Sequence, residues 1–174
     1  MYYRLSCLAL AAGLLVSGCS KSSTSPTTTT AAPPKFTATL SPANEVPAIT
    51  NADAGASGVA TITLNVTKDA AGNVTAATAD FAVTLTGFPA NTTLTGAHIH
   101  TGAAGATGGI LVNTTLTNGE VVLANGSGGI NKLSITVDPA VAQAIINGPS
   151  GYYFNVHTTL NSGGAARAQL VRAN

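Results

Sequence analysis

Short stretches in which apolar and polar residues alternate recur along most of the chain. In SGVATITLNVT, residues 57–67, the side chains of Ala60, Ile62, Leu64 and Val66 fall on one face of an extended backbone. Successive side chains of a strand point to opposite faces, so this period of two predicts a β-strand that buries one face. Further strands are predicted over residues 36–40, 81–85, 94–100, 110–115, 121–124, 132–137, 152–157 and 166–171.

Turn-forming residues separate these stretches, as in AGN at 71–73, NG at 118–119 and the glycine-rich run at 126–129. Many short strands with such turns between them are typical of an all-β domain. We therefore predict an antiparallel β-sandwich or a Greek-key, barrel-like domain.

One segment departs from the β pattern. Asp138 can cap a helix N-terminus, Pro139 suits the first helical position, and Gly148 suits the position after the last turn. This punctuation predicts one short helix that closes an end of the sandwich. Its apolar stripe would consist of Val141, Ile145 and Ile146.

The N-terminal residues 1–18 have the pattern of an export signal. Arg4 precedes the apolar run CLALAAGLLV, which is too short to span a bilayer. Small residues before Cys19 resemble the cleavage site of bacterial lipoproteins, and that resemblance implies cleavage before Cys19 and a lipid on its thiol. An ordinary secretory signal with a chance cysteine is the alternative. Ser20 stands where inner-membrane retention uses aspartate, so the sorting rule implies an outer-membrane anchor in the cell envelope.

Residues 19–34 are rich in Thr, Ser and Pro, and this composition predicts a disordered tether. Residues 35–174 are then long enough for one β domain with its own core. The second cysteine, Cys7, lies within the signal, so the domain has no thiol for a disulfide or a Cys–metal site. Few charges and no basic run argue against nucleic acid as a partner.

The chemistry of the domain is concentrated in three histidines. His98 and His100 share one face of a predicted strand, about 7 Å apart along it, and His157 ends another strand. Imidazole is a ligand of copper and zinc, so the three histidines could form a metal site. They could instead form a structural polar network, or contact a ligand without metal. The residues that could join such a network or a second shell are Glu45, Asn155, Arg167 and Gln169.

Two of these residues have open alternatives of their own. Glu45 could reach the histidines as a ligand or an orienting group, or could cap a turn before Pro47. Arg167 has no acidic partner within its own motif, and Glu45 is a possible one. The HIH strand is similar to the copper-ligand strand of Cu/Zn superoxide dismutases. Those enzymes use more histidines than this chain has, which argues against that activity.

Three blocks of the chain resemble the CHRD domain, the module named from chordin. They are FTATLSPANEVPAI, GAHIHTGAAGATGGILV and GYYFNVHTTLNSGGAARAQL, and the resemblance covers residues 35–170. The family pattern places an acidic residue where Ala165 stands, while Arg167 and Gln169 match it. The resemblance implies an extracellular β-sandwich-like domain and no enzymatic activity.

Together these observations predict a lipid-anchored envelope protein whose domain is a non-catalytic binding or structural module. Its partners would be the membrane, through the lipid on Cys19, and a protein or glycan that the sequence does not identify. The alternative is a copper or zinc binding protein that uses His98, His100 and His157.

Overall fold

The computed structural model describes residues 32–173, and these residues form strands in two sheets. The predicted export signal, the lipidated Cys19 and the tether as far as residue 31 lie outside the described residues. The strands are β1 (Lys35–Leu40), β2 (Ser57–Lys68), β3 (Val74–Thr86), β4 (Thr92–Thr101), β5 (Ile110–Asn113), β6 (Val122–Leu123), β7 (Gly128–Val137), β8 (Tyr152–Thr158), β9 (Ala166–Gln169) and β10 (Val171–Ala173). The helices are α1 (Pro139–Asn147) and the short 3₁₀ turns η1 (Pro42–Asn44), η2 (Ala52–Gly55) and η3 (Pro149–Gly151).

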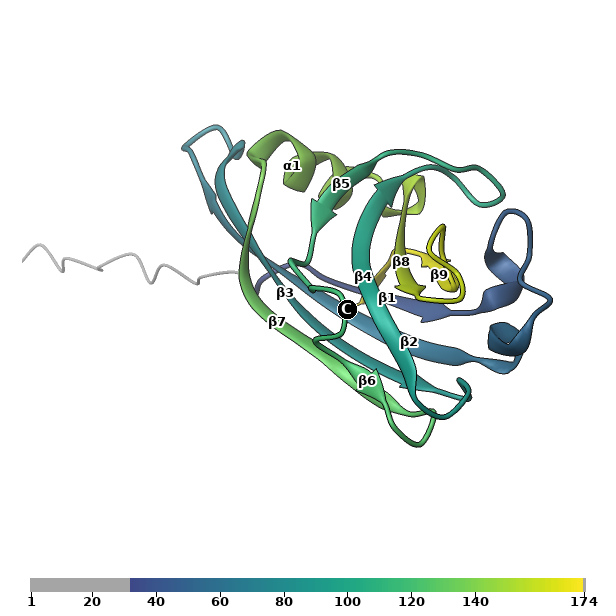
Figure 1. Cartoon of the computed structure of the whole chain (residues 1–174). Helices are drawn as coiled ribbons and strands as arrows, with labels where there is room; N and C mark the ends of the chain where they lie inside the picture. Colours follow the sequence, from purple (N-terminus) through teal and green to yellow (C-terminus); the bar gives the residue numbers. More distant parts are fainter. Residues whose placement is uncertain (1–31, 174) are drawn as a thin grey trace, which may run out of the picture. The chain divides into compact units, whose positions relative to one another are not determined.

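The first sheet has the strand order β10-β1-β2-β3-β7, and the second has the order β5-β4-β8-β9. The small strand β6 also pairs with β4. Every pairing in both sheets is antiparallel. Figure 1 shows the two sheets as separate layers that do not close into a barrel. The predicted antiparallel β-sandwich with one short α-helix is therefore confirmed.

The core lies between the two sheets, where the apolar faces of the strands meet. Phe81 of β3 and Phe154 of β8 are both fully buried, and their rings stack with centroids 5.8 Å apart. The predicted alternation in β2 is confirmed, because Ala60, Ile62 and Leu64 are fully buried. Full burial of a large apolar side chain such as Ile62, Leu64 or Phe81 contributes about 1.5–3 kcal/mol to folding. Since the described residues contain no cysteine, this packing and the backbone ladders must stabilise the domain.

Three predicted strands differ clearly from those observed. β7 begins at Gly128, within the glycine-rich run 126–129 that the sequence pattern predicts to be a turn, and not at Lys132. The segment 166–171 is two strands, because the chain passes from the second sheet to the first at the buried Leu170. The segment 81–85 is only the end of β3, which begins at Val74. The earlier part of β3 buries Ala77 and Ala79, whose small side chains give a weak hydrophobic pattern.

The helix α1 begins as the sequence predicts. The Asp138 carboxylate accepts hydrogen bonds from the backbone N–H groups of Ala140 (2.8 Å) and Val141 (3.2 Å). The predicted stripe faces the core: Ile145 is fully buried, and Val141 and Ile146 are partly buried against it. Ala142 is a further fully buried residue of this face. In Figure 1 the helix lies at the end of the sheets, beside β3.

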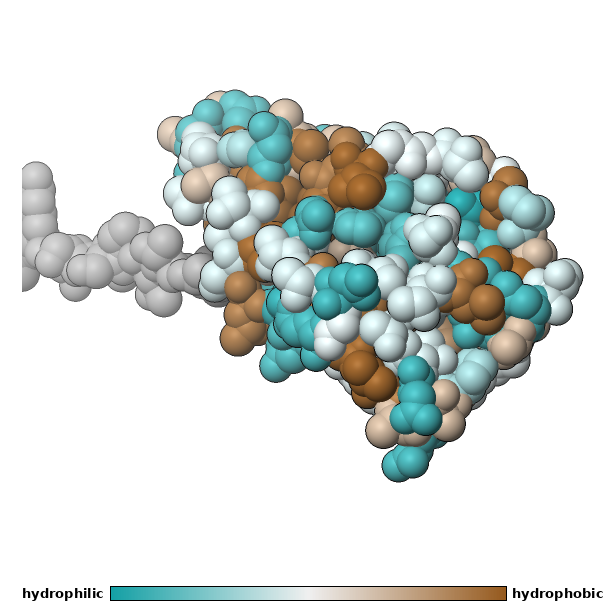
Figure 2. All heavy atoms as spheres, in the orientation of Figure 1, coloured by the Kyte–Doolittle hydropathy of each residue, from teal (hydrophilic) through white to brown (hydrophobic). Residues whose placement is uncertain are grey.

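The surface of the domain is mixed. Figure 2 shows apolar and polar residues interspersed over the face in view. No helix among residues 32–173 is long and apolar enough to cross a membrane.

Candidate functional site

The outer face of the second sheet carries a row of polar and aromatic side chains, which we call the polar layer. Alternation along the strands separates it from the core, because Ile99 and Phe154 on the opposite face are fully buried. Three segments hydrogen-bond to this layer, namely residues 41–45, 102–109 and 159–164. The layer consists of His98 and His100 from β4, Tyr153, Asn155 and His157 from β8, and Arg167 and Gln169 from β9.

Two β-bulges lie near the histidines of β4, one before His98 and one between Ile99 and His100. Thr95 is an extra residue where β4 pairs with β8, and Leu111 is an extra residue where β5 pairs with β4. Bulges bend a strand and change the direction of nearby side chains. They therefore help to aim His98 and His100 from the strand that carries them.

Gly96 leaves room for the ring of His98. A Cβ atom on Gly96 would lie 2.9 Å from Cε1 of His98 and 3.3 Å from its Nε2. The ring thus lies back over its own strand, and only glycine leaves it that space. Because Gly96 pairs with His157 across the sheet, this position brings His98 toward His157.

The three histidines form one cluster. One ring nitrogen from each lies within 4.8 Å of one from the others. Nδ1 of His98 and Nε2 of His157 are 3.1 Å apart, and the ring centroids are separated by 4.9 to 6.0 Å. The two predicted groups, HIH in β4 and His157 in β8, therefore meet at one point.

Backbone carbonyls set the tautomers of two rings. Nδ1 of His100 lies 3.1 Å from the carbonyl oxygen of Gly108, and Nδ1 of His157 lies 2.9 Å from that of Ser162. A carbonyl can only accept, so both Nδ1 atoms carry the proton. In the neutral rings Nε2 of His157 then accepts a hydrogen bond from Nδ1 of His98, and of the two only Nε2 of His100 keeps an unshared electron pair. Nε2 of His100 is buried and has no hydrogen-bond partner among the described residues.

Burial also keeps the rings neutral. Burial, together with the smaller effects of the neighbouring His157 and His100, lowers the pKa of His98 to about 4. Burial likewise lowers the pKa of His100 and of His157, although their bonds to the Gly108 and Ser162 carbonyls act in the opposite direction. All three rings are therefore neutral at pH 7, the form in which imidazole binds metal ions.

A stack of three side chains supports the cluster. The His100 ring lies parallel to the Tyr153 ring, with centroids 4.9 Å apart and an angle of 5° between the planes. The Arg167 guanidinium lies 4.6 Å from the centre of the Tyr153 ring. Arg167 also donates to the carbonyls of Asn44 (2.6 Å) and Ala106 (3.0 Å), so it fixes two covering segments.

Glu45 lies at the edge of this stack. Its Oε2 atom is 3.9 Å from Nε of Arg167. Glu45 is therefore an acidic partner of Arg167, whose own sequence motif contains no acidic residue. Burial raises the pKa of Glu45 to about 7, although Arg167 acts to lower it. Its backbone N–H closes the η1 turn by donating to the carbonyl of Pro42. The cluster of nitrogens that could hold a metal ion comes from the three histidines and does not include Glu45.

The other predicted site residues have separate places. Asn155 is buried beside the cluster, opposite His98 in the sheet. Gln169 lies farther along β9, where its Nε2 donates to three backbone carbonyls, of Gly102, Ser150 and Tyr152. Ala165 is fully buried, and its N–H donates to the carbonyl of Val156.

Two contributors to the site were not predicted. Tyr153 shares a strand face with His157, and that alternation could have suggested its role. Gly96 stands two residues before His98, but nothing in the sequence indicates that the His98 ring lies back over it.

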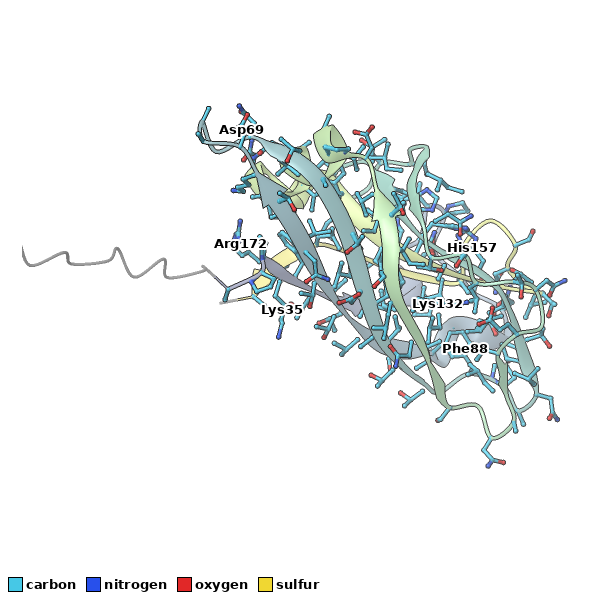
Figure 3. All side chains as sticks on the ribbon, turned by 90° about the vertical axis from the view of Figure 1, so that its left-hand side faces the viewer. Lys35, Asp69, Phe88, Lys132, His157 and Arg172 are labelled. Atoms are coloured by element: carbon cyan, nitrogen blue, oxygen red, sulfur yellow. The ribbon has the colours of Figure 1, made fainter. Side chains whose placement is uncertain are left out.

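Figure 3 shows that His157 lies well apart from Lys35, where β1 begins.

The comparisons with known proteins identify the family but no individual relative. No curated protein and no solved structure matches the chain. The family model described as CHRD domain matches residues 36–170, which is most of the chain. This protein therefore belongs to the CHRD domain family.

Proposed function

We propose that this CHRD domain binds a copper or zinc ion through His98, His100 and His157. The observation that carries the proposal is the convergence of three imidazole nitrogens within 4.8 Å of one another. Donors of a tetrahedral site with Zn–N bonds of 2.0–2.1 Å lie about 3.3 Å apart. His98 and His157 already have such a spacing at 3.1 Å, so His100 has the larger distance to close.

The hydrogen bonds of the cluster favour metal binding over a purely structural network. A structural network is expected to satisfy both nitrogens of each buried ring. Here the backbone holds His100 and His157 through Nδ1, and Nε2 of His100 has no hydrogen-bond partner among the described residues. Histidines that ligate metals are oriented in this way, with the second ring nitrogen donating to a carbonyl.

The domain is a non-catalytic module in this account, as is general for the CHRD family. The ion would hold two covering segments together, because His100 is bonded to residues 102–109 and His157 to residues 159–164. A protein or glycan partner stays a prediction from the sequence.

We further propose that the module is anchored in the cell envelope, in the outer membrane, by a lipid on Cys19. The support is the sequence pattern of an apolar run followed by small residues and Cys19, with Ser20 after it. Membrane fractions of cells that express the protein or its Cys19→Ser variant test this directly. We expect the protein to sediment with membranes and to carry acyl mass, and the variant to do neither.

Titration of the purified full-length protein with Zn²⁺ and Cu²⁺ tests the metal proposal. We expect one ion per chain and submicromolar affinity. The variant His157→Gln should keep the fold and bind the ion at least tenfold more weakly. Mutation of groups that only orient a ligand already lowers metal affinity by about 10- to 100-fold. Equal binding by the protein and by a folded variant that lacks all three histidines would refute the proposal.

A further inference from the structure

The polar layer contains an unusual set of buried acceptors. Nε2 of His100, Oδ1 of Asn155 and Oε1 of Glu45 are all buried, and none has a hydrogen-bond partner among the described residues. A buried acceptor without a donor is unfavourable, so a group of them indicates that something positive is bound there. An ion bound by the three histidines alone would give a partner to Nε2 of His100, but not to Oδ1 of Asn155 or Oε1 of Glu45.

The sheet register places Asn155 in the middle of the cluster. Asn155 pairs with His98 of β4 on one side and with Arg167 of β9 on the other. Within β8 it lies between Tyr153 and His157 and shares their face. Side chains that are directly opposite in an antiparallel pair have Cβ atoms about 4.5–5.5 Å apart. Asn155 is therefore a neighbour of two histidines of the cluster, although only 2% of it is exposed.

The amide of Asn155 has a defined orientation. A Cβ atom on Gly164 would lie 2.5 Å from Nδ2 of Asn155 and 2.8 and 2.9 Å from the two carboxylate oxygens of Glu45. The amide nitrogen and the carboxylate thus face the same small volume beside Gly164. That assignment is the favourable one, because an NH₂ group, rather than an amide oxygen, should face a carboxylate. Nδ2, and not Oδ1, is the amide atom nearest to this volume, so Nδ2 occupies the side of the amide toward Gly164 and Oδ1 the other side.

We propose that Oδ1 of Asn155 is the fourth ligand of the ion, beside the nitrogens of His98, His100 and His157. This inference rests on the proposed function and extends it from three donors to four. Three imidazoles and one amide oxygen suit Zn²⁺ or Cu²⁺, whereas Cu⁺ prefers softer donors. The occupant is therefore a divalent ion, and the site is closed by protein atoms.

Cobalt(II) provides the test, because the intensity and position of its visible bands report the number and type of its ligands. The full-length protein, Asn155→Asp and Asn155→Leu are titrated with Co²⁺, and Zn²⁺ competition gives relative affinities. Asn131→Asp is the matched control, since Asn131 is an exposed residue of β7 in the other sheet. Circular dichroism establishes that each variant is folded.

We expect intense four-coordinate bands in the protein and in the control. Asn155→Asp replaces a neutral oxygen donor by an anionic one, so the bands should shift and the affinity should rise, roughly tenfold. Asn155→Leu should change the coordination of the cobalt and weaken binding by a similar factor.

Two results would overturn the inference, and they are distinguishable. If Co²⁺ binds the protein and neither change at Asn155 alters the bands or the affinity, Asn155 is not a ligand and the three-histidine site stands. If none of Co²⁺, Zn²⁺ and Cu²⁺ binds the unmodified protein, the proposed function itself fails.

Discussion

The substitution Gly96→Ala should separate metal binding from folding. All three atoms nearest to an added Cβ belong to the His98 ring, the closest at 2.9 Å. Ordinary contact begins at 3.4 Å, so the ring must withdraw by about 0.5 Å. Metal–ligand distances tolerate about 0.2 Å, and the displaced ring can therefore no longer ligate. We expect affinity for Zn²⁺ to fall by on the order of 10- to 100-fold, the range found when the support of a ligand is lost.

The fold should tolerate this change. The His98 ring can turn toward solvent, and Gly96 has no positive φ that an alanine would strain. Replacing glycine by alanine at a compatible position stabilises by about 0.4–1 kcal/mol through the unfolded chain. The melting temperature of the metal-free variant should thus be equal to or slightly above that of the unmodified protein.

Competition between the protein and a chromophoric chelator for Zn²⁺ measures the affinity. Gly163→Ala is the matched control, because an added Cβ there meets no atom within 4 Å. Its affinity should equal that of the unmodified protein. If Gly96→Ala binds Zn²⁺ as tightly as this control, the His98 ring is not part of the site and the reasoning is refuted.

Three further predictions concern pH and packing. The pKa of Glu45 is raised to about 7, so its contribution to stability is complete below its unfolded value of about 4.5 and is lost as pH rises through 7. Between about pH 4.5 and about pH 7 the melting temperature of the protein should therefore fall relative to that of Glu45→Gln, with no further relative change well above pH 7; parallel curves would contradict this assignment. Because burial lowers the pKa of each histidine, the affinity for Zn²⁺ should change little between about pH 7.5 and 6. A clear loss of affinity over this range would contradict this, because it is the behaviour of histidines with the ordinary pKa of about 6.5. Phe81→Ala should cost about 3–5 kcal/mol in chemical denaturation, and a cost below about 1 kcal/mol would exclude the stacked Phe81–Phe154 core.

Much of the fold follows from local patterns. The alternation of Ala60, Ile62 and Leu64 predicts both a strand and its buried face, and Asp138-Pro139 predicts the start of α1. Local patterns fail where tertiary contacts decide. The chain changes sheets at Leu170 without any turn residue, and the buried Ala77 and Ala79 are too small to mark the first half of β3.

The site is predictable only in part, because tertiary contacts as well as local patterns determine how it is assembled. Strand alternation places His98 and His100 on one face, but only the pairing of β4 with β8 brings His157 to them. The proximity of Glu45 to Arg167 depends on a turn more than a hundred residues away along the chain. The role of Gly96 depends on the rotamer of His98, which no sequence pattern specifies.

X-ray absorption of the zinc-loaded, dialysed protein tests the central claim most directly. The account predicts one retained ion per chain, with nitrogen and oxygen donors at about 2.0–2.1 Å and the multiple-scattering pattern of three imidazoles. Loss of the ion on dialysis, or a spectrum without imidazole scattering, would contradict it.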